Sequence, residues 1–255
     1  MKTELLWPFT VATAALLFAA WTAASALNLV NPLFLPGPGL LFSSFLDLLL
    51  NGYKGYSLPA HIGISLMRVL LGFGSGAIVG TLIGLGMGAA PLFDALAAPF
   101  VEFLRPLPQL AYLVLLIVWF GIGETSKIVL LFLTALPVAA IAARDGVRNV
   151  PLQRIQAARA LGASPAQIFR HVIFPSALPE IFIGARLAVG IVYATLIAAE
   201  IIAGSNGIGW LVFDAGRFLR SDYVFVGVLL IGLMGLGLDF ALRTIERKVV
   251  HWAGK

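Results

Sequence analysis

One charged stretch limits what this chain can fold into. Residues 155–179 (IQAARALGASPAQIFRHVIFPSALP) have a helical pattern, yet the stretch is too charged to cross a bilayer. Burying its arginines in lipid would cost on the order of 15 kcal/mol, at about 3 kcal/mol each. We therefore expect this stretch in water, between membrane spans. The arginines on it or just before it are Arg144, Arg148, Arg154, Arg159 and Arg170.

Glycine and proline divide the stretch into two short helices. Residues 151–161 are compatible with a helix, and Gly162 suits the position after its end, where a positive φ is needed. Ser164 suits an N-cap, and Pro165 suits the first position of a second helix, which runs through Val172. Two prolines then follow, Pro175 and Pro179.

The composition indicates a polytopic membrane protein. Of the 255 residues, 60% are hydrophobic and only 11% are charged, whereas soluble domains carry about 25% charged residues. The absence of cysteine excludes disulfides, thiolate metal sites and a cysteine nucleophile. The net charge of +5 fits an excess of Lys and Arg in cytoplasmic loops. We expect contact with the lipid bilayer and no nucleic acid.

The apolar runs predict an all-α integral membrane protein with about six transmembrane helices in one domain, residues 1–255. Residues 40–50 suit an interfacial helix along the membrane surface, and residues 92–105 suit a polar return. Ala24-Ser25-Ala26 leaves open a cleaved signal peptide in place of the first span. The expected spans are residues 5–27, 59–90, 107–120, 128–143, 178–203 and 223–241.

The distribution of positive charge predicts the orientation. With six spans, and with residues 155–179 and the C-terminus inside, the N-terminus is inside as well. We therefore expect both termini in the cytoplasm. That side holds eleven basic residues: Lys2, Arg105, Arg144, Arg148, Arg154, Arg159, Arg170, Arg243, Arg247, Lys248 and Lys255. The opposite loops hold four: Lys54, Lys127, Arg217 and Arg220.

Two further patterns lie within the expected spans. The second span carries five glycines at four-residue spacing, which favours close packing by another helix rather than a ligand site. Charged residues within spans are functional candidates by default. Depth permits Arg68 to pair with Glu200, and Arg186 with Asp239; we favour helix-locking ion pairs over substrate contacts. The glycines are Gly72, Gly76, Gly80, Gly84 and Gly88.

An outer loop, residues 204–222, contains an amphipathic segment (210–219) that is too short to span. Its charges carry both signs, which suits docking of a soluble partner better than attraction of a free anion. A solvated interfacial helix without a partner is the alternative. The candidate docking residues are Asp214, Arg217, Arg220 and Asp222.

Several of these segments resemble one known family. Ala157-Ala158, Gly162 and Ile173-Phe174-Pro175 are similar to the EAA loop of ABC importer permeases. Gln156 departs from the pattern, because the family has Glu there; Gln keeps the hydrogen-bonding reach but loses the charge. Residues 60–250 resemble the nitrate/sulfonate/taurine branch, nearest to the taurine permeases. The motifs are Arg105-Pro106 with Pro108, residues 119–127, and Ala198-Ala199-Glu200 before Gly207-Ile208-Gly209.

The resemblance implies a type I ABC importer permease fold in a bacterial inner membrane. It implies a homodimer of permease chains, two cytoplasmic ATPase subunits and an extracytoplasmic, periplasmic binding protein. Loop 144–178 would couple to the ATPase, and the solute would be a small anion or zwitterion. Taurine or another sulfonate is favoured; nitrate, bicarbonate and a pyrimidine precursor stay open. The implied coupling residues are Arg154, Gln156, Ala157, Ala158, Arg159, Gly162, Ala163 and Ser164.

Two other functional classes are alternatives to a permease. An ion-coupled secondary transporter, which needs no ATPase, often shows paired broken helices in two halves, and no such repeat is found. A membrane enzyme is disfavoured, because the histidines are far apart and no metal or nucleophile spacing occurs. The chain also lacks a Walker A sequence, so we expect no cofactor in it; ATP and Mg belong to the partner ATPase. The histidines are His61, His171 and His251.

Overall fold

The structure is a computed structural model that describes residues 7–27 and 29–252; over these residues it is helical and contains no β-strand. The all-α prediction is therefore confirmed. The elements in chain order are α1 (Trp7–Ala26), α2 (Pro38–Leu50), α3 (Leu58–Ala89), α4 (Pro91–Leu104), α5 (Gln109–Phe120), α6 (Glu124–Arg148), α7 (Leu152–Ala160), α8 (Pro165–Ile168), a π-helical turn (Phe169–Ile173), α9 (Phe174–Ala203), α10 (Ile208–Arg217) and α11 (Ser221–Val249).

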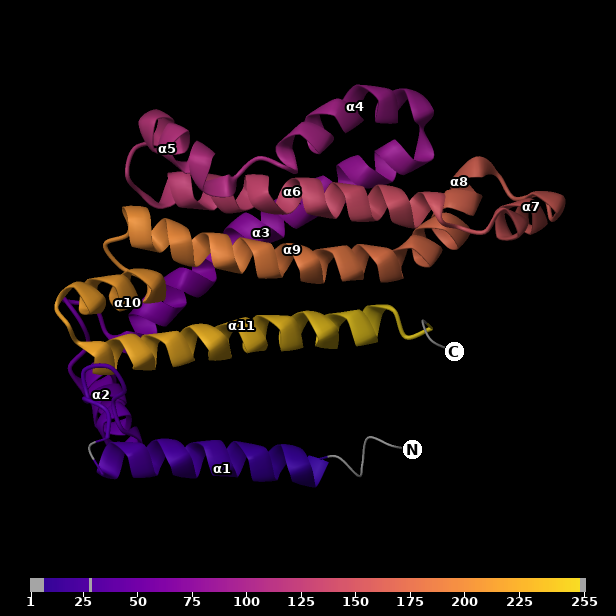
Figure 1. Cartoon of the computed structure of the whole chain (residues 1–255). Helices are drawn as coiled ribbons and strands as arrows, with labels where there is room; N and C mark the ends of the chain where they lie inside the picture. Colours follow the sequence, from indigo (N-terminus) through magenta and orange to yellow (C-terminus); the bar gives the residue numbers. More distant parts are fainter. Residues whose placement is uncertain (1–6, 28, 253–255) are drawn as a thin grey trace.

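The long helices run side by side, with α3, α6 and α9 packed together at the centre (Figure 1). Helix α11 lies beside α9 and α10, whereas α1 stands apart and is joined to the rest through α2. The first described turn of α1, the end of α11 and helix α7 all lie at one end of the molecule. Helices α2, α5 and α10 lie at the other end, which we call the α10 end.

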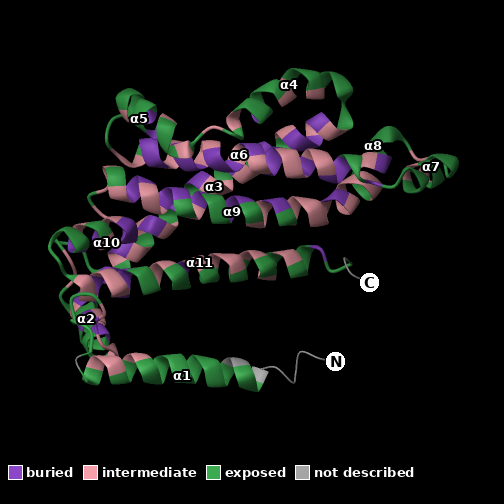
Figure 2. Ribbon diagram, viewed as in Figure 1, coloured by how far each residue is buried: buried purple, intermediate pink, exposed green. Residues whose placement is uncertain are grey.

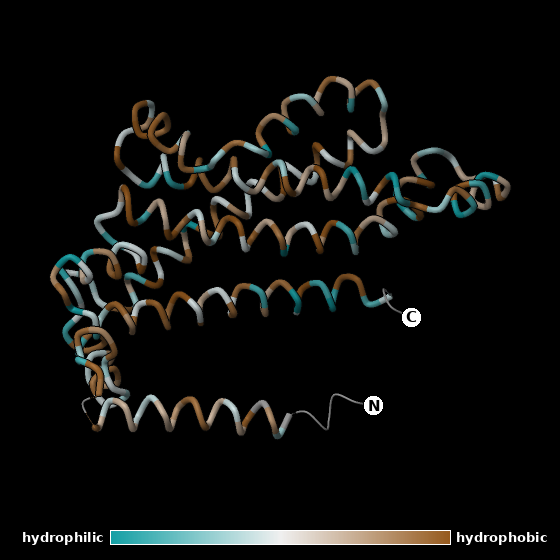
Figure 3. Tube along the Cα trace, viewed as in Figure 1, coloured by the Kyte–Doolittle hydropathy of each residue, from teal (hydrophilic) through white to brown (hydrophobic). Residues whose placement is uncertain are grey.

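Burial follows this arrangement. Buried residues line the faces that α3, α6 and α9 turn toward one another, while α1, α4 and much of α11 are exposed (Figure 2). Figure 3 shows that many of these exposed residues are apolar and that hydrophilic residues gather toward the helix ends. An apolar exterior of this kind is stable in lipid, because lipid tails are as apolar as these side chains.

Length and composition support four membrane spans: α3, α6, the combined helix Pro165–Ala203, and α11. Helices α4 and α5 meet at a bend of 98°, and the pair is apolar enough for a fifth, broken span or a re-entrant loop. The described apolar part of α1, Val11–Ala26, is shorter. The count of six spans depends on α1 and stays a prediction, as does the orientation.

The expected polar return at residues 92–105 is wrong. This segment is α4, a helix whose exposed face carries Leu96 and Phe100. Its acids do not make it polar overall, because Asp94 pairs with Arg148 at 2.7 Å and Glu102 with Arg144 at 3.0 Å. The chain turns after α4, at the two prolines that were expected to open a span, Pro106 and Pro108.

Several helices extend beyond their expected limits. Helix α6 already begins at Glu124, so Lys127, expected in an outer loop, lies in its first turns and is 2% exposed. Pro175 does not interrupt the helical path, since it lies at the start of α9, next to the π-helical turn. That turn shifts the hydrogen-bond register, so a single helical path runs from Pro165 to Ala203.

The glycine stripe of α3 packs against α6. A Cβ atom at Gly80 would lie 2.3 Å from the carbonyl oxygen of Leu136, and one at Gly84 would lie 2.0 Å from that of Ala140. The other three positions meet α6 in the same way, whereas Gly74, on another face, has nothing within 4 Å. The stripe therefore serves close backbone packing, as its spacing predicts.

Candidate functional site

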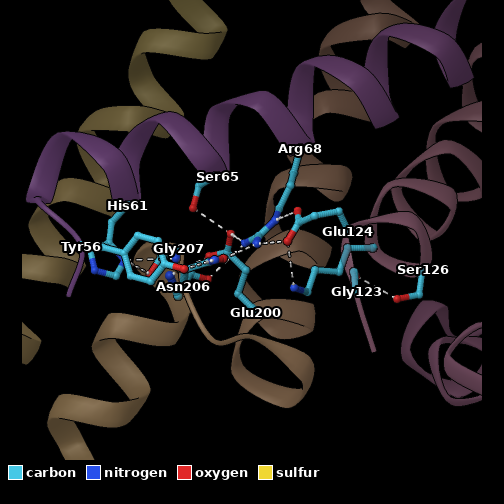
Figure 4. Close-up of polar contacts among 12 residues, drawn as sticks. Tyr56, His61, Ser65, Arg68, Gly123, Glu124, Ser126, Glu200, Asn206 and Gly207 are labelled. Carbon is cyan, nitrogen blue, oxygen red and sulfur yellow. Dashed lines mark hydrogen bonds and ion pairs between the residues drawn. The ribbon is translucent and has the colours of Figure 1, made fainter. Parts of the chain in front are cut away.

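A buried arginine joins three helices near the α10 end of the bundle (Figure 4). Arg68 of α3 has no exposed surface, and its Nη1 donates to Glu200 Oε1 of α9 at 2.6 Å. Its Nε donates to Glu124 Oε2, at the start of α6, at 2.6 Å. The predicted contact between Arg68 and Glu200 is thus present, and Glu124 adds a second carboxylate that the sequence reasoning did not place there.

The same guanidinium holds the loop between α9 and α10. Arg68 Nη1 donates to the carbonyl oxygen of Asn206 at 3.1 Å, and Nη2 donates to the Asn206 side chain. Glu200 also accepts from the backbone N–H of Gly209 at 2.8 Å. Gly207 has a φ of +104°, and a Cβ atom there would lie 2.4 Å from the Glu200 carboxylate. Only glycine therefore fits between this loop and the cluster.

Two polar residues of α3 complete the enclosure of the loop. Ser65 donates to Glu200 Oε1 at 2.7 Å and accepts from the N–H of Ile208 at 3.0 Å. His61 Nδ1 lies 3.1 Å from the backbone nitrogen and 3.2 Å from the carbonyl oxygen of Gly207, and its Nε2 lies 3.2 Å from the carbonyl oxygen of Tyr53. The cluster thus ties the loop between α9 and α10 to α3 through several hydrogen bonds.

The inner charged pair is present but more open. Arg186 Nε of α9 donates to Asp239 Oδ1 of α11 at 3.3 Å, and its Nη1 lies 3.6 Å from Glu246. Arg243 pairs with the same Asp239 at 2.7 Å. About a third of each side chain in the Arg186–Asp239 pair is exposed. The contact joins α9 to α11, as the depth argument predicts, without closing a buried site.

A cavity of about 420 Å³ lies along α6 and α9, beneath the bend between α4 and α5. Its walls are mostly apolar, and it contains polar side chains as well. Glu180 is a residue that the sequence reasoning missed, although it falls within the expected fifth span, where an unpaired charge is itself a signal. The polar lining residues are Arg105, Gln109, Tyr112, Thr134, Asp145 and Glu180.

The expected coupling residues form an exposed protrusion. Helix α7 has no buried residue, and Gly162 after it has a φ of +81° with open space around it. Ser164 caps α8 in a capping box with Gln167, as the pattern predicts in part. The second helix differs from expectation, because α8 ends at Ile168 and the π-helical turn follows. The structure brings the eight residues together on this one exposed segment.

Most of the expected docking charges are engaged within the chain. Asp214 accepts from the Tyr53 hydroxyl at 2.8 Å, and burial together with this contact raises the pKa of Tyr53. Arg220 donates to Asp222 at 2.9 Å, which raises the pKa of Arg220, and it stacks over Tyr223. Arg217 makes no hydrogen bond or ion pair through its side chain with any described residue. The four residues are close to α10 but are not equivalent.

Comparison with known proteins agrees with these features. Residues 76–251 match the family described as the binding-protein-dependent transport system inner membrane component. The chain is 39% identical over 256 residues to the taurine transport system permease protein TauC of Escherichia coli, covering 98% of this chain and 93% of TauC. It is 35% identical over 238 residues to the putative aliphatic sulfonates transport permease protein SsuC of Bacillus subtilis, covering 93% and 85%.

The fold is also found among solved structures. An inward-facing form of the MetNI methionine ABC transporter superposes with a TM-score of 0.61 and 24% sequence identity. The match covers 75% of this chain and 95% of the MetNI chain. At this level of identity the match supports the fold, and the sequence relatives support the family.

Proposed function

The chain belongs to the binding-protein-dependent transport inner membrane components, and from this premise we propose that it forms the path by which taurine or a related sulfonate crosses the membrane. It is the permease component of an ABC importer for taurine-, sulfonate- or nitrate-type solutes, and ATP hydrolysis lies in partner chains. The 39% identity to TauC over nearly the whole chain is the observation that carries the choice of taurine.

Coupling to the ATPase is assigned to the protrusion of α7 and α8. Three features support this assignment: α7 buries none of its residues, Gly162 fixes a sharp turn, and the capping box holds α8 in place. An exposed yet rigid element can transmit movement of a bound partner into α9, because the helical path continues from Pro165 without a break. The role given to this segment rests on the resemblance and on this geometry together.

The assembly follows the family pattern. We propose two copies of this chain, two ATPase subunits on the α7 side and a binding protein on the α10 side, in a bacterial inner membrane. The end of the molecule that contains α7, opposite the α10 end, carries most of the basic residues outside the spans. This distribution favours that side as cytoplasmic. Helix α10 and the neighbouring charged loop are then available to the binding protein.

Uptake by the reconstituted complex tests the proposal. Proteoliposomes with the permease, its ATPase and its loaded binding protein should accumulate labelled taurine, and unlabelled nitrate should compete poorly. Replacing the Walker A lysine of the ATPase should abolish uptake, because that lysine contacts the nucleotide phosphates. Uptake driven by an ion gradient with the disabled ATPase would contradict the proposal and favour a secondary transporter. Uptake of nitrate or an alkanesulfonate, but not of taurine, would change the proposed solute and leave the proposed permease function in place.

A further inference from the structure

The cavity beneath the α4–α5 bend contains charges of both signs. Arg105 follows the end of α4, Asp145 is near the end of α6, and Glu180 is near the start of α9. Three separate helices thus bring ionisable groups to one space of about 420 Å³. Glu180 falls within the expected fifth span, where a charge is a functional candidate, whereas Arg105 is exposed after the end of α4.

The three charges differ in what they already contact. Asp145 accepts from Arg144 Nε at 3.2 Å. In contrast, neither Arg105 nor Glu180 makes a side-chain hydrogen bond or ion pair with any residue in the described part of the chain. The Cβ of Glu180 packs closely against Gly146 of α6, since it would lie 3.1 Å from a Cβ atom placed on that glycine. The cavity is therefore lined by an exposed cation, Arg105, and a half-buried anion, Glu180, neither of which has a partner among the described residues.

The remaining walls suit a small molecule with a short carbon chain. Leu133, Val138 and Leu187 supply apolar surface, while Tyr112 and Thr134 supply hydroxyl groups. Thr134 Oγ1 donates to the carbonyl oxygen of Leu130 at 2.8 Å and lies 3.5 Å from the Tyr112 hydroxyl. The contact between the two hydroxyls is weak, so the Tyr112 hydroxyl can turn to a ligand. Mostly apolar walls with a few polar groups are typical of a ligand site.

We propose that this cavity binds a compact zwitterion, with its sulfonate or carboxylate group on Arg105 and its ammonium group on Glu180. A simple anion would meet the negative charge of Glu180 and be repelled, so the site would select an amino sulfonate over an alkanesulfonate of the same length. The inference rests on the proposed function, because it gives the permease its own selectivity for the solute delivered to it.

Direct binding to the permease–ATPase complex, without the binding protein, tests this site. Labelled taurine should bind the wild-type complex, and ethanesulfonate, which lacks the amine, should compete weakly. Glu180→Gln should lower taurine affinity by at least about tenfold, since a hydrogen bond between charged groups is lost. The same change should leave ethanesulfonate binding equal or stronger, because the repulsion is removed. Arg105→Gln should weaken both ligands.

Two further variants control for damage to the fold. Glu180→Asp keeps the charge and should retain much more taurine affinity than Glu180→Gln. Glu102→Gln removes an acid at the end of the same α4 that pairs with Arg144 and does not line the cavity, so it should bind taurine like the wild type. Each complex is compared at equal monodispersity in gel filtration.

The outcomes separate this inference from the proposed function. If the wild-type complex binds no taurine while the full importer transports it, the cavity site is overturned and the permease function stands. Equal taurine affinity in the wild type and Glu180→Gln also overturns it. If the full importer does not transport taurine, the choice of solute in the proposed function fails instead.

Discussion

The Arg68 cluster and the α7 protrusion lie at opposite ends of the molecule and hold their structure in different ways. The fully buried guanidinium of Arg68 pairs with carboxylates from two other helices, Glu200 and the partly exposed Glu124, and with a loop. In α7, no residue is buried, and the shape depends on local turn chemistry at Gly162 and Ser164. The first region is stabilised by tertiary contacts, while the second is free to be covered by a partner.

The largest expected effect concerns the buried region of this comparison, the Arg68 cluster. Arg68→Met leaves Glu200 buried without its cation, and removing one partner of a buried ion pair costs about 3 to 5 kcal/mol. We expect a large fall in the melting temperature in detergent, or failure of the protein to accumulate. Arg154→Met is the matched control, because Arg154 is exposed on α7 and, among the described residues, its side chain bonds only to Ser176, at 3.4 Å. Equal melting temperatures for the two variants would show that the cluster does not stabilise the fold.

The glycine stripe gives the next largest effect. Gly80→Leu forces a side chain into the backbone of α6, and overpacking of this kind costs roughly 1 to 3 kcal/mol or more. The melting temperature and uptake should both fall. Gly74→Leu places the same side chain on α3 where nothing lies within 4 Å, so it should be tolerated. If both variants melt together with the wild type, α3 and α6 are not packed as closely as the structure shows.

Local chemistry made part of this molecule predictable. Gly162 and Ser164 could be interpreted from the sequence, because a positive φ and an N-cap depend on a few neighbouring residues. Arg68 and Glu200 could be paired, because buried charges in lipid need partners and depth leaves few choices. The five-glycine spacing likewise indicates a packing face before the partner helix is known.

Features that depend on tertiary geometry were not predictable in the same way. The sequence predicts a turn at Glu124, and the contact of Glu124 with Arg68 depends on where α6 begins. The sequence also predicts a start for the fifth span later than that of α9, because Pro175 suggests a break that the π-helical turn avoids. The cavity needs α4, α6 and α9 together, so no single stretch indicates that Arg105 and Glu180 share it.

A change at Gly162 tests the exposed region of the comparison, the α7 protrusion. Gly162→Val places a β-branched residue at a φ of +81°, which such residues rarely adopt. The melting temperature should change little, because nothing is packed there, while uptake should be largely lost as the angle between α7 and α8 changes. Gly162→Asn is the control, since Asn tolerates this conformation better, and it should retain more uptake. Normal uptake by the Val variant, with the ATPase still co-purifying, would contradict a coupling role.

The smallest expected effect concerns Arg217 at the α10 end. Arg220 is engaged with Asp222 and Tyr223, so its reversal would also disturb the loop, whereas Arg217 has no side-chain partner among the described residues. Rim charges mainly change association rates and their salt dependence. Arg217→Glu should therefore lower stimulation of ATPase activity by the loaded binding protein, relative to its own unstimulated rate, by roughly three- to tenfold at low salt. The deficit should shrink at high salt, where the Debye length falls to about 3 Å at 1 M.

Arg247→Glu is the control. It makes the same charge reversal near the end of α11 and should leave the stimulation curve unchanged. Curves for Arg217→Glu that overlay the wild type at every salt concentration would mean that α10 is a solvated helix without a partner. Arg217 and Arg247 would then differ only in the end of the molecule at which they lie.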